Sequence, residues 1–275
     1  MIVSLCNEVV RELDFPAQCA LAKGLGYDGL EIAPFTLSDA PDRLPAARRA
    51  ELRRIAQDHG VAITGLHYLL LAPAGLSITS ADEAVRARTI EVMRALIELC
   101  AELGGKVLVH GSPKQRLVGP GQSRDEALAR AKECFAAIAG DAEEAGVTYC
   151  IEPLAPPEAE LINTVEEAAA IVEEIGRPAV RTMIDTCAAG RSERAPIPEL
   201  IERWLPTGHV AHVHLNDPNR RAPGQGELRF GPILAALQAQ GYAGICSVEP
   251  FIYEPDGATC AARAIGYVRG LLEAG

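Results

Sequence analysis

Residues 147–186 read VTYCIEPLAPPEAELINTVEEAAAIVEEIGRPAVRTMIDT, and this stretch contains one complete strand–helix–strand unit. The β-branched, apolar runs Thr148–Ile151 and Val180–Ile184 are typical of buried strands. Between them, Val165–Ile175 has the apolar periodicity of an amphipathic helix. A connection of this length that includes a helix is what joins parallel strands. The stretch therefore predicts one unit of a parallel α/β sheet.

Four polar residues each follow a predicted strand in the second half of the chain: Glu152, Asp185, His214 and Glu249. They are 33, 29 and 35 residues apart, which is one strand–helix unit each time. The strands that precede them are Thr148–Ile151, Val180–Ile184, Val210–Val213 and Ile245–Val248. Because parallel strands end at one edge of a sheet, we expect the four side chains to lie close together there.

The whole chain repeats this alternation eight times. The other expected strands are Ile2–Cys6, Gly29–Ile32, Ala62–Leu66 and Lys106–Val109. The expected helices are Pro16–Leu25, Ala46–His59, Ala81–Leu103, Ser123–Ala145, Val165–Ile175, Ile197–Trp204, Pro232–Gln240 and Thr259–Glu273. One closed barrel takes about 250 residues, so we expect residues 1–275 to form a single α/β domain, a (β/α)8 TIM barrel. A doubly wound open sheet is the alternative, but no Gly-x-Gly-x-x-Gly follows the first strand.

Local signals at the helix ends agree with these ranges. Glycine, which tolerates the positive φ of a helix C-terminus, follows six of the predicted helices at Gly26, Gly60, Gly104, Gly146, Gly176 and Gly241. Ser80-Ala-Asp-Glu83 and Ser123-Arg-Asp-Glu126 predict capping boxes at helix starts, and Thr164 predicts a further N-cap.

Charge and composition exclude several classes of protein. The chain carries 26 Lys and Arg against 37 Asp and Glu, a formal charge of −11, and its aromatic content is 4%. Nucleic-acid binding needs a basic face and usually aromatic platforms for the bases, so no nucleic acid is expected as a partner. No apolar stretch approaches the length of a membrane span, so no membrane contact is expected.

The eight cysteines fall in or beside predicted strands and in predicted helices, without a Cys-x-x-Cys pair. This distribution is typical of small buried side chains in a reducing compartment. The chain also runs into its first strand at Ile2 without a basic leader. We therefore expect a cytoplasmic protein with free thiols.

Three carboxylates and one imidazole at a single edge would repel one another unless a cation lay between them. No Lys or Arg stands immediately beside any of the four in the sequence. Oxygen-rich donors with one imidazole suit Mn²⁺, which we expect first, and also Mg²⁺, Co²⁺ or Zn²⁺. The sequence therefore predicts one divalent metal ion.

An ordered set of motifs resembles the sugar isomerase/epimerase family of xylose isomerase-like TIM barrels, and within it the ketose 3-epimerases of the D-tagatose/D-psicose type. The motifs are Glu152-Pro-Leu, Glu158, Asn163-Thr164, Asp185-Thr186, His212-x-His214-x-Asn216, Arg220 and Glu249-Pro-Phe. The resemblance implies four metal ligands, namely Glu152, Asp185, His214 and Glu249. It also implies that Glu152 and Glu249 are the acid and base, and that Glu158 and Arg220 contact substrate oxygens.

The chemistry of such a site is proton transfer next to a carbonyl. A metal-bound hydroxyketone has an acidified α-proton because the cation stabilises the enediolate. One carboxylate removes the proton and another returns it, which gives an epimerase or isomerase of a sugar or polyol-like substrate. An inosose-type dehydratase on the same barrel, which expels water instead, is the alternative, and a non-catalytic metal- or sugar-binding barrel is more distant. The sequence leaves open whether the chain forms a homo-oligomer.

One position departs from the ketose epimerases, which usually carry a substrate-contacting histidine three residues after the metal aspartate. This chain has Ala188 there. Lys114 and Arg116, in Ser112-Pro-Lys-Gln-Arg116 after the fourth strand, could instead recognise a carboxylate or phosphate of the substrate. We therefore expect a substrate that differs from a free ketohexose; a solvated loop is the other reading of this basic segment.

His67 and His110 follow the third and fourth strands, where endonuclease IV-like barrels hold additional zinc ions for phosphodiester cleavage. That branch also needs histidines after the sixth and seventh strands that this chain lacks. We therefore expect His67 and His110 to line the pocket as substrate-binding residues. His212 should orient His214 from the same strand, and Glu31 either binds a sugar hydroxyl or pairs with a neighbour.

Overall fold

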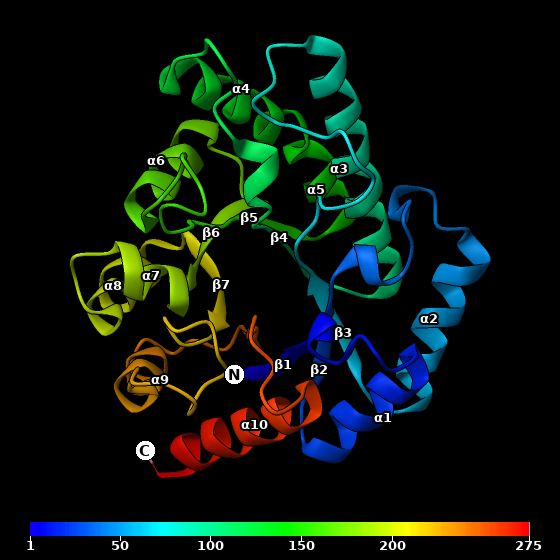
Figure 1. The fold of residues 1–275 in the computed structure, drawn as a ribbon, viewed down its shortest axis with the longest axis vertical. Helices are drawn as coiled ribbons and strands as arrows, with labels where there is room; N and C mark the ends of the chain where they lie inside the picture. Colours follow the sequence, from blue (N-terminus) through cyan, green and yellow to red (C-terminus); the bar gives the residue numbers. More distant parts are fainter. Residues whose placement is uncertain (275) are drawn as a thin grey trace.

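A closed barrel of eight parallel strands forms the centre of the computed structural model, which describes residues 1–274 (Figure 1). Each strand pairs with the next one along the chain, and β8 closes the barrel against β1. The strands are β1 Ile2–Cys6, β2 Gly29–Ile32, β3 Ala62–Leu66, β4 Val107–His110, β5 Thr148–Ile151, β6 Val180–Asp185, β7 Val210–Leu215 and β8 Ile245–Val248. The predicted TIM barrel is confirmed.

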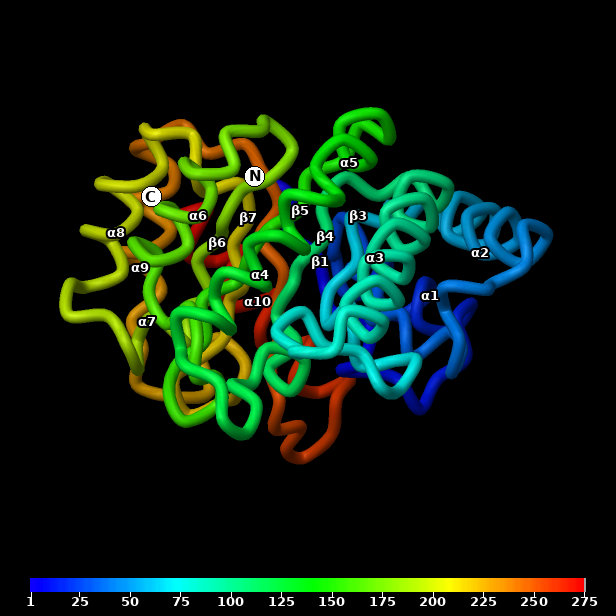
Figure 2. Tube along the Cα trace, turned by 90° about the horizontal axis from the view of Figure 1, so that it is seen from above, coloured from blue at the N-terminus to red at the C-terminus, as the bar shows by residue number. Residues whose placement is uncertain are grey.

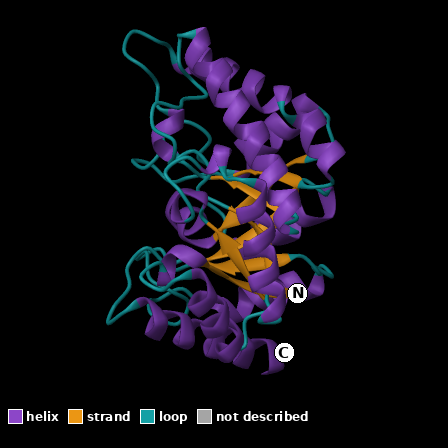
Figure 3. Ribbon diagram, turned by 90° about the vertical axis from the view of Figure 1, so that its right-hand side faces the viewer, coloured by secondary structure: helices purple, strands orange, loops and turns teal. Residues whose placement is uncertain are grey.

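Helices surround the strands as an outer layer (Figure 3). They are α1 Phe15–Leu25, α2 Ala46–Asp58, α3 Glu83–Leu103, α4 Arg124–Ala137, α5 Ala139–Ala145, α6 Val165–Ile175, α7 Thr186–Ser192, α8 Ile197–Trp204, α9 Phe230–Ala239 and α10 Gly257–Ala274. Figure 2 shows α1–α3 on one side of the barrel and α7–α9 on the other. Short 3₁₀ helices include η1 Asn7–Val10 after β1 and η4 Pro113–Arg116 after β4. No helix within residues 1–274 has the length and apolar character needed to cross a lipid bilayer.

Two helical segments differ from the prediction. The single helix expected over Ser123–Ala145 is broken at Ile138, a fully buried β-branched residue whose φ of −105° and ψ of −2° separate α4 from α5. Helix α7 was not predicted, because seven residues are too few to show helical periodicity. Asp185 is the N-cap of α7, since its side chain accepts a hydrogen bond from the backbone N–H of Ala188.

The helix caps follow the sequence signals with one exception. All six glycines named above have positive φ, between 63° and 92°, and Ser123 forms the predicted capping box with Glu126. Thr164 is the N-cap of α6. The capping box at Ser80 is wrong, because Asp82 caps α3 and the Ser80 hydroxyl accepts from the N–H of Asp82 instead.

Side chains alternate between the barrel interior and the helix layer along each strand. Apolar residues fill part of the interior as a small cluster of Val107, Val109, Cys150, Met183 and Ile245. Glu152 and Asp185 stand two residues beyond Cys150 and Met183, so the same face of each strand turns from apolar to acidic at its carboxyl end. All eight cysteines are buried free thiols.

Candidate active site

The four groups that follow β5 to β8 converge at the carboxyl end of the barrel. Ligand atoms of Glu152, Asp185, His214 and Glu249 all lie within 4.8 Å of one another, and all four residues are buried. His214 Nδ1 is central, at 2.9 Å from Glu249 Oε2, 3.7 Å from Glu152 Oε1 and 3.9 Å from Asp185 Oδ2. The predicted convergence is confirmed, and we call these four residues the donor cluster.

Asn216, one residue beyond β7, holds two members of the donor cluster. Its side-chain amide donates to Asp185 Oδ2 at 2.7 Å and to the backbone carbonyl of Glu249 at 3.0 Å. Its amide oxygen accepts from the N–H of Cys187 at 2.7 Å, at the start of α7. The ends of β6, β7 and β8 are therefore joined through one side chain.

The electrostatics of the donor cluster suit a cation. Burial, and then the charges of Glu152 and Glu249, raise the pKa of Asp185 to about 8. Burial also raises the pKa of Glu152, although hydrogen bonding with His214 acts in the opposite direction and lowers it. Burial opposes the ionisation of Glu249 as well, but His214 and His67 outweigh it and lower its pKa to about 2. Three carboxylates and one imidazole in one buried space are a donor set that fits a divalent metal ion.

Glu31, on β2, orients His214 from the other side of the imidazole. Its Oε1 lies 3.2 Å from His214 Nε2, and its Oε2 lies 2.9 Å from His212 Nε2 and accepts from the Ser247 hydroxyl. A carboxylate on the far nitrogen leaves Nδ1 facing the donor cluster. Of the two readings of Glu31, pairing with neighbours is therefore the one that the structure supports, and His212 shares the same carboxylate.

His67, after β3, lies between two carboxylates. Its Nδ1 is 3.0 Å from Glu249 Oε1, and its Nε2 is 2.9 Å from Glu8 Oε2 on η1. Burial lowers its pKa, but Glu8 and Glu249 outweigh this and raise it to about 10. The fully buried ring contacts Glu249 and does not form the cavity wall, which corrects the expectation that His67 binds substrate. Glu8 was not predicted, since no pattern around it marks a partner at the end of β3.

A cavity of about 230 Å³ opens next to the donor cluster. Its wall is formed by Tyr68, Gly111, Pro113, Lys114, Glu152, Leu154, Glu158, Arg220, Glu249 and Phe251. Five of the predicted site residues are therefore at one cavity. Tyr68 and Phe251 were not predicted, although Phe251 stands in the Glu249-Pro-Phe motif.

Glu158 and Arg220 form a polar part of the cavity wall. Arg220 Nη1 lies 3.1 Å from Glu158 Oε1, which Arg191 also approaches to 2.7 Å. The guanidinium of Arg220 stacks on the Phe251 ring at 5.0 Å from its centroid. Arg220 has a φ of 70°, and its carbonyl accepts from the N–H groups of Phe251 and Ile252. The loop after β7 is therefore tied to the segment after β8.

His110 points away from the cavity, because its neighbour Val109 faces the barrel interior. His110 Nδ1 is hydrogen-bonded to the Tyr149 hydroxyl at 2.8 Å, and the ring packs edge-on against Phe135 of α4. Burial, and then the charge of Arg116, lower its pKa to about 3. The expectation that His110 lines the pocket is wrong.

Arg116 is also absent from the cavity wall. Its side chain is fully buried, and Nη1 donates to the backbone carbonyl of Glu152 at 2.7 Å. The basic segment after β4 is therefore split, with Lys114 at the cavity and Arg116 behind Glu152.

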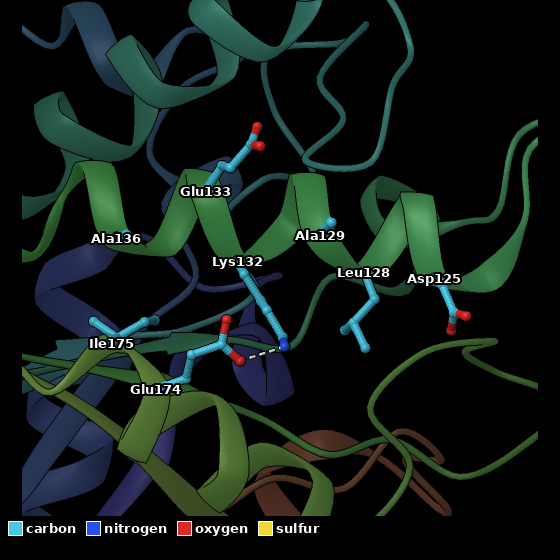
Figure 4. Close-up of a pocket in the computed structure, with 8 residues that line it drawn as sticks. All are labelled: Asp125, Leu128, Ala129, Lys132, Glu133, Ala136, Glu174 and Ile175. Atoms are coloured by element: carbon cyan, nitrogen blue, oxygen red, sulfur yellow. Dashed lines mark hydrogen bonds and ion pairs between the residues drawn. The ribbon is translucent and has the colours of Figure 1, made fainter.

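A larger groove of about 590 Å³ lies on the outer layer between α4 and α6 (Figure 4). Lys132 of α4 reaches Glu174 of α6 across it, whereas Glu133 points away from α6. Exposed ion pairs of this kind are ordinary surface contacts. Glu152 and Glu249, whose pKa values are shifted in opposite directions, line the smaller cavity, which is the better candidate for catalysis.

Comparisons with known proteins agree with the fold and identify the family. Residues 19–270 match the family described as xylose isomerase-like TIM barrel. The chain is 32% identical to L-ribulose 3-epimerase of Mesorhizobium japonicum over 234 residues, which cover 83% of this chain and 73% of the relative. It is 29% identical to D-psicose 3-epimerase of Agrobacterium fabrum over 231 residues, which cover 83% and 76%.

Solved structures show the same architecture. A structure of L-ribulose 3-epimerase superposes with a TM-score of 0.83 at 25% identity, over 100% of this chain and 95% of that chain. The 3-keto-D-glucoside 4-epimerase of E. coli reaches 0.84 at 20% identity, over 98% and 99%, and shares the fold. The chain belongs to the family of xylose isomerase-like TIM barrels.

Proposed function

We propose that this protein is a metal-dependent sugar epimerase that transfers a proton at the carbon next to a ketose carbonyl. The observation that carries the proposal is the position of Glu152 and Glu249. Both belong to the donor cluster, and both also form the wall of the 230 Å³ cavity. Two carboxylates on one cavity are what a two-base proton transfer requires.

Glu152, Asp185, His214 and Glu249 would hold the metal ion, with Mn²⁺ as the first candidate. A bound divalent cation would act as a Lewis acid toward the carbonyl and the neighbouring hydroxyl of the sugar. Glu249 is held by His67 and His214, and Glu152 by contacts of its backbone. One of the two carboxylates takes the proton, and the other returns a proton to the opposite face of the carbon.

The cavity favours a substrate of monosaccharide size, since its volume lies below the roughly 300–1,000 Å³ of pockets for drug-sized ligands. The names of the relatives point to ketoses such as psicose and ribulose. Glu158 and Arg220 offer an acceptor and a donor for hydroxyl groups, and Phe251 offers an apolar face. Lys114 is the remaining candidate for binding an anionic group of the substrate, because Arg116 does not line the cavity.

An inosose-type dehydratase would use the same donor cluster, and the product distinguishes the two. The endonuclease IV-like alternative has less support, because His67 is engaged by Glu8 and Glu249 while His110 faces α4.

The experiment is to incubate the Mn²⁺-loaded protein with D-psicose, D-fructose, L-ribulose and an inosose in D₂O and to follow the products by NMR. We expect the C3 epimer of a ketose with deuterium at C3. Glu152→Gln and Glu249→Gln are the matched negative controls. Loss of water from the inosose without exchange in any ketose would establish the dehydratase in place of the epimerase.

A further inference from the structure

The segment from His110, the last residue of β4, to Arg116 contacts Glu152 at several points. The N–H of Glu152 donates to the carbonyl of His110 at 3.3 Å, and its own carbonyl accepts from Arg116 Nη1 at 2.7 Å. Both backbone polar groups of one candidate catalytic residue therefore bind the same seven-residue segment. The next residue is Pro153, which has no N–H to anchor the chain beyond β5.

The same segment also shapes the space around the Glu152 carboxylate. A Cβ added to Gly111 would lie 1.6 Å from Glu152 Oε2 and 2.8 Å from its carboxyl carbon. No side chain fits there while Glu152 keeps its position, so glycine is needed for a close approach. Gly111 therefore leaves room for the carboxylate of Glu152, and Arg116 binds the backbone carbonyl of the same residue.

Arg116 is costly to bury, which indicates a specific role. Its guanidinium is fully buried, and no carboxylate within residues 1–274 lies in ion-pair distance of it. Its Nε and Nη2 have no hydrogen-bond partner among the described residues. A buried charge without a paired carboxylate is normally destabilising, so a purely structural reason for arginine at this position is weak.

Two hydrogen bonds anchor the segment to the connection between β3 and α3. The Ser112 hydroxyl accepts from the N–H of Leu70 at 3.0 Å, and the carbonyl of Gln115 accepts from the N–H of Ile78 at 2.9 Å. These bonds fix the path of the chain on both sides of Pro113. Hydrogen bonds within the protein therefore fix the residues on both sides of Lys114 and lead the chain to Arg116.

We propose that Arg116 is a positioning residue for Glu152, and that Gly111 and Arg116 together hold this carboxylate at the cavity and in the donor cluster. The role assigned to Glu152 rests on the proposed function, but the contacts with Glu152 do not. Arg116, which the sequence predicts as a contact for an anionic group of the substrate, thus acts through the backbone of Glu152 instead. Misplacing a reacting group by about 1 Å costs on the order of 100-fold in rate, which sets the scale of the effect.

The test compares Arg116→Met and Arg116→Lys with Arg181→Met. Arg181 is the matched control, because its Nη1 also donates to backbone carbonyls, those of Arg177 and Val180, but at the opposite end of the barrel. We expect Arg116→Met to lower kcat by about 10- to 100-fold and to weaken Mn²⁺ binding in calorimetry by about 10-fold, with KM unchanged. Arg116→Lys should recover part of both losses, since lysine keeps a donor and the charge. Arg181→Met should change neither.

Gly111→Ala is the second variant, and it decides the matter if Arg116→Met does not fold. The three atoms nearest to its methyl group all belong to the movable carboxyl group of Glu152, so it should displace Glu152 and lower kcat and Mn²⁺ affinity while the protein stays folded. The positioning role would be overturned if folded Gly111→Ala and Arg116→Lys both had the Mn²⁺ affinity and kcat of the wild type. Any Arg116→Met protein that folds would then have to show wild-type values as well. If wild-type protein epimerises no ketose but both variants still bind Mn²⁺ more weakly, the positioning role stands and the proposed function fails.

Discussion

Strands β5–β8 and strands β1–β4 contribute to the mouth of the barrel in different ways. The second half supplies the whole donor cluster, from Glu152 to Glu249. The first half and its loops supply residues that hold this cluster in place: Glu31 contacts His214, His67 contacts Glu249, and Arg116 contacts the backbone of Glu152. The donor cluster therefore comes from the second half of the chain, and Glu31, His67 and Arg116 support it from the first half, in addition to Asn216 from the second.

The difference teaches that neither half can form the site alone. The contact between His214 and Glu31 spans 183 residues, and that between His67 and Glu249 spans 182. Closure of the barrel, with β8 beside β1, brings these partners together. Substitutions in the second half should therefore remove chemistry or ligands, whereas substitutions in the first half should weaken what remains.

The largest effect is expected from Asp185→Ala and His214→Ala. Each removes a central donor of the buried cluster, so Mn²⁺ binding should no longer be detectable by calorimetry. Asp58→Ala is the control, because Asp58 pairs with Arg54 on the exposed face of α2. Tight Mn²⁺ binding by either cluster variant would break the assignment of metal donors to the second half.

Glu152→Gln and Glu249→Gln should come next. An amide oxygen can still coordinate a cation but cannot exchange a proton, so kcat should fall by about 10²- to 10⁴-fold. KM and Mn²⁺ affinity should change less than kcat, which steady-state kinetics and calorimetry separate. Two Gln variants with wild-type turnover would rule out a mechanism with two carboxylates.

Glu31→Gln probes the supporting half. The amide can no longer accept strongly from His212 and His214, so His214 should be less well oriented and Mn²⁺ affinity should fall by about 10- to 100-fold. Glu51→Gln on exposed α2 is the matched control, since it removes a charge from a surface pair with Arg48. If both variants bind Mn²⁺ equally well, the orientation of His214 by Glu31 contributes nothing to the Mn²⁺ affinity.

His110 should make the stability of the folded protein depend on pH, and it should have no effect on the candidate active site. Its pKa is about 3 in the folded protein and about 6.5 when unfolded. Below pH 6.5 the unfolded chain therefore binds a proton that the folded protein does not, and stability falls as the pH falls toward 3. About 2 kcal/mol should be lost between pH 7 and pH 5.

His110→Asn should lack this part of the pH dependence, which urea unfolding at several pH values would measure. Parallel curves for the wild type and the variant would mean that His110 is accessible to solvent. That result would favour the position of His110 at the cavity that the sequence predicts.

The smallest effect is expected at Lys114, whose side chain is exposed at the cavity wall. An exposed charge contributes little, so Lys114→Ala should raise KM for anionic sugar analogues by no more than about fivefold. KM for the neutral analogues should stay the same. An equal change for both sets would leave Lys114 without a role in recognising anions.

The sequence predicts the second half of the site well and the first half poorly, for a physical reason. Glu152 and Asp185 are marked by local patterns, because each directly ends a strand with a clear apolar run. The partners of Glu31 and His67 depend on contacts across the closed barrel, which no local pattern contains. His110 was misplaced because Leu108 and Val109 are both apolar, so the sequence does not tell which face of β4 is inside.

Asp185 has a second duty, since its Oδ1 accepts from the N–H of Ala188 and caps α7 while Oδ2 belongs to the donor cluster. The first turn of a helix in the outer layer is thus fastened to a carboxylate of the buried donor cluster. Filling the cluster would fix this carboxylate, and the amide protons of α7 should then exchange with solvent more slowly. A helix of seven residues on the outside of the barrel would in this way report whether the interior is occupied.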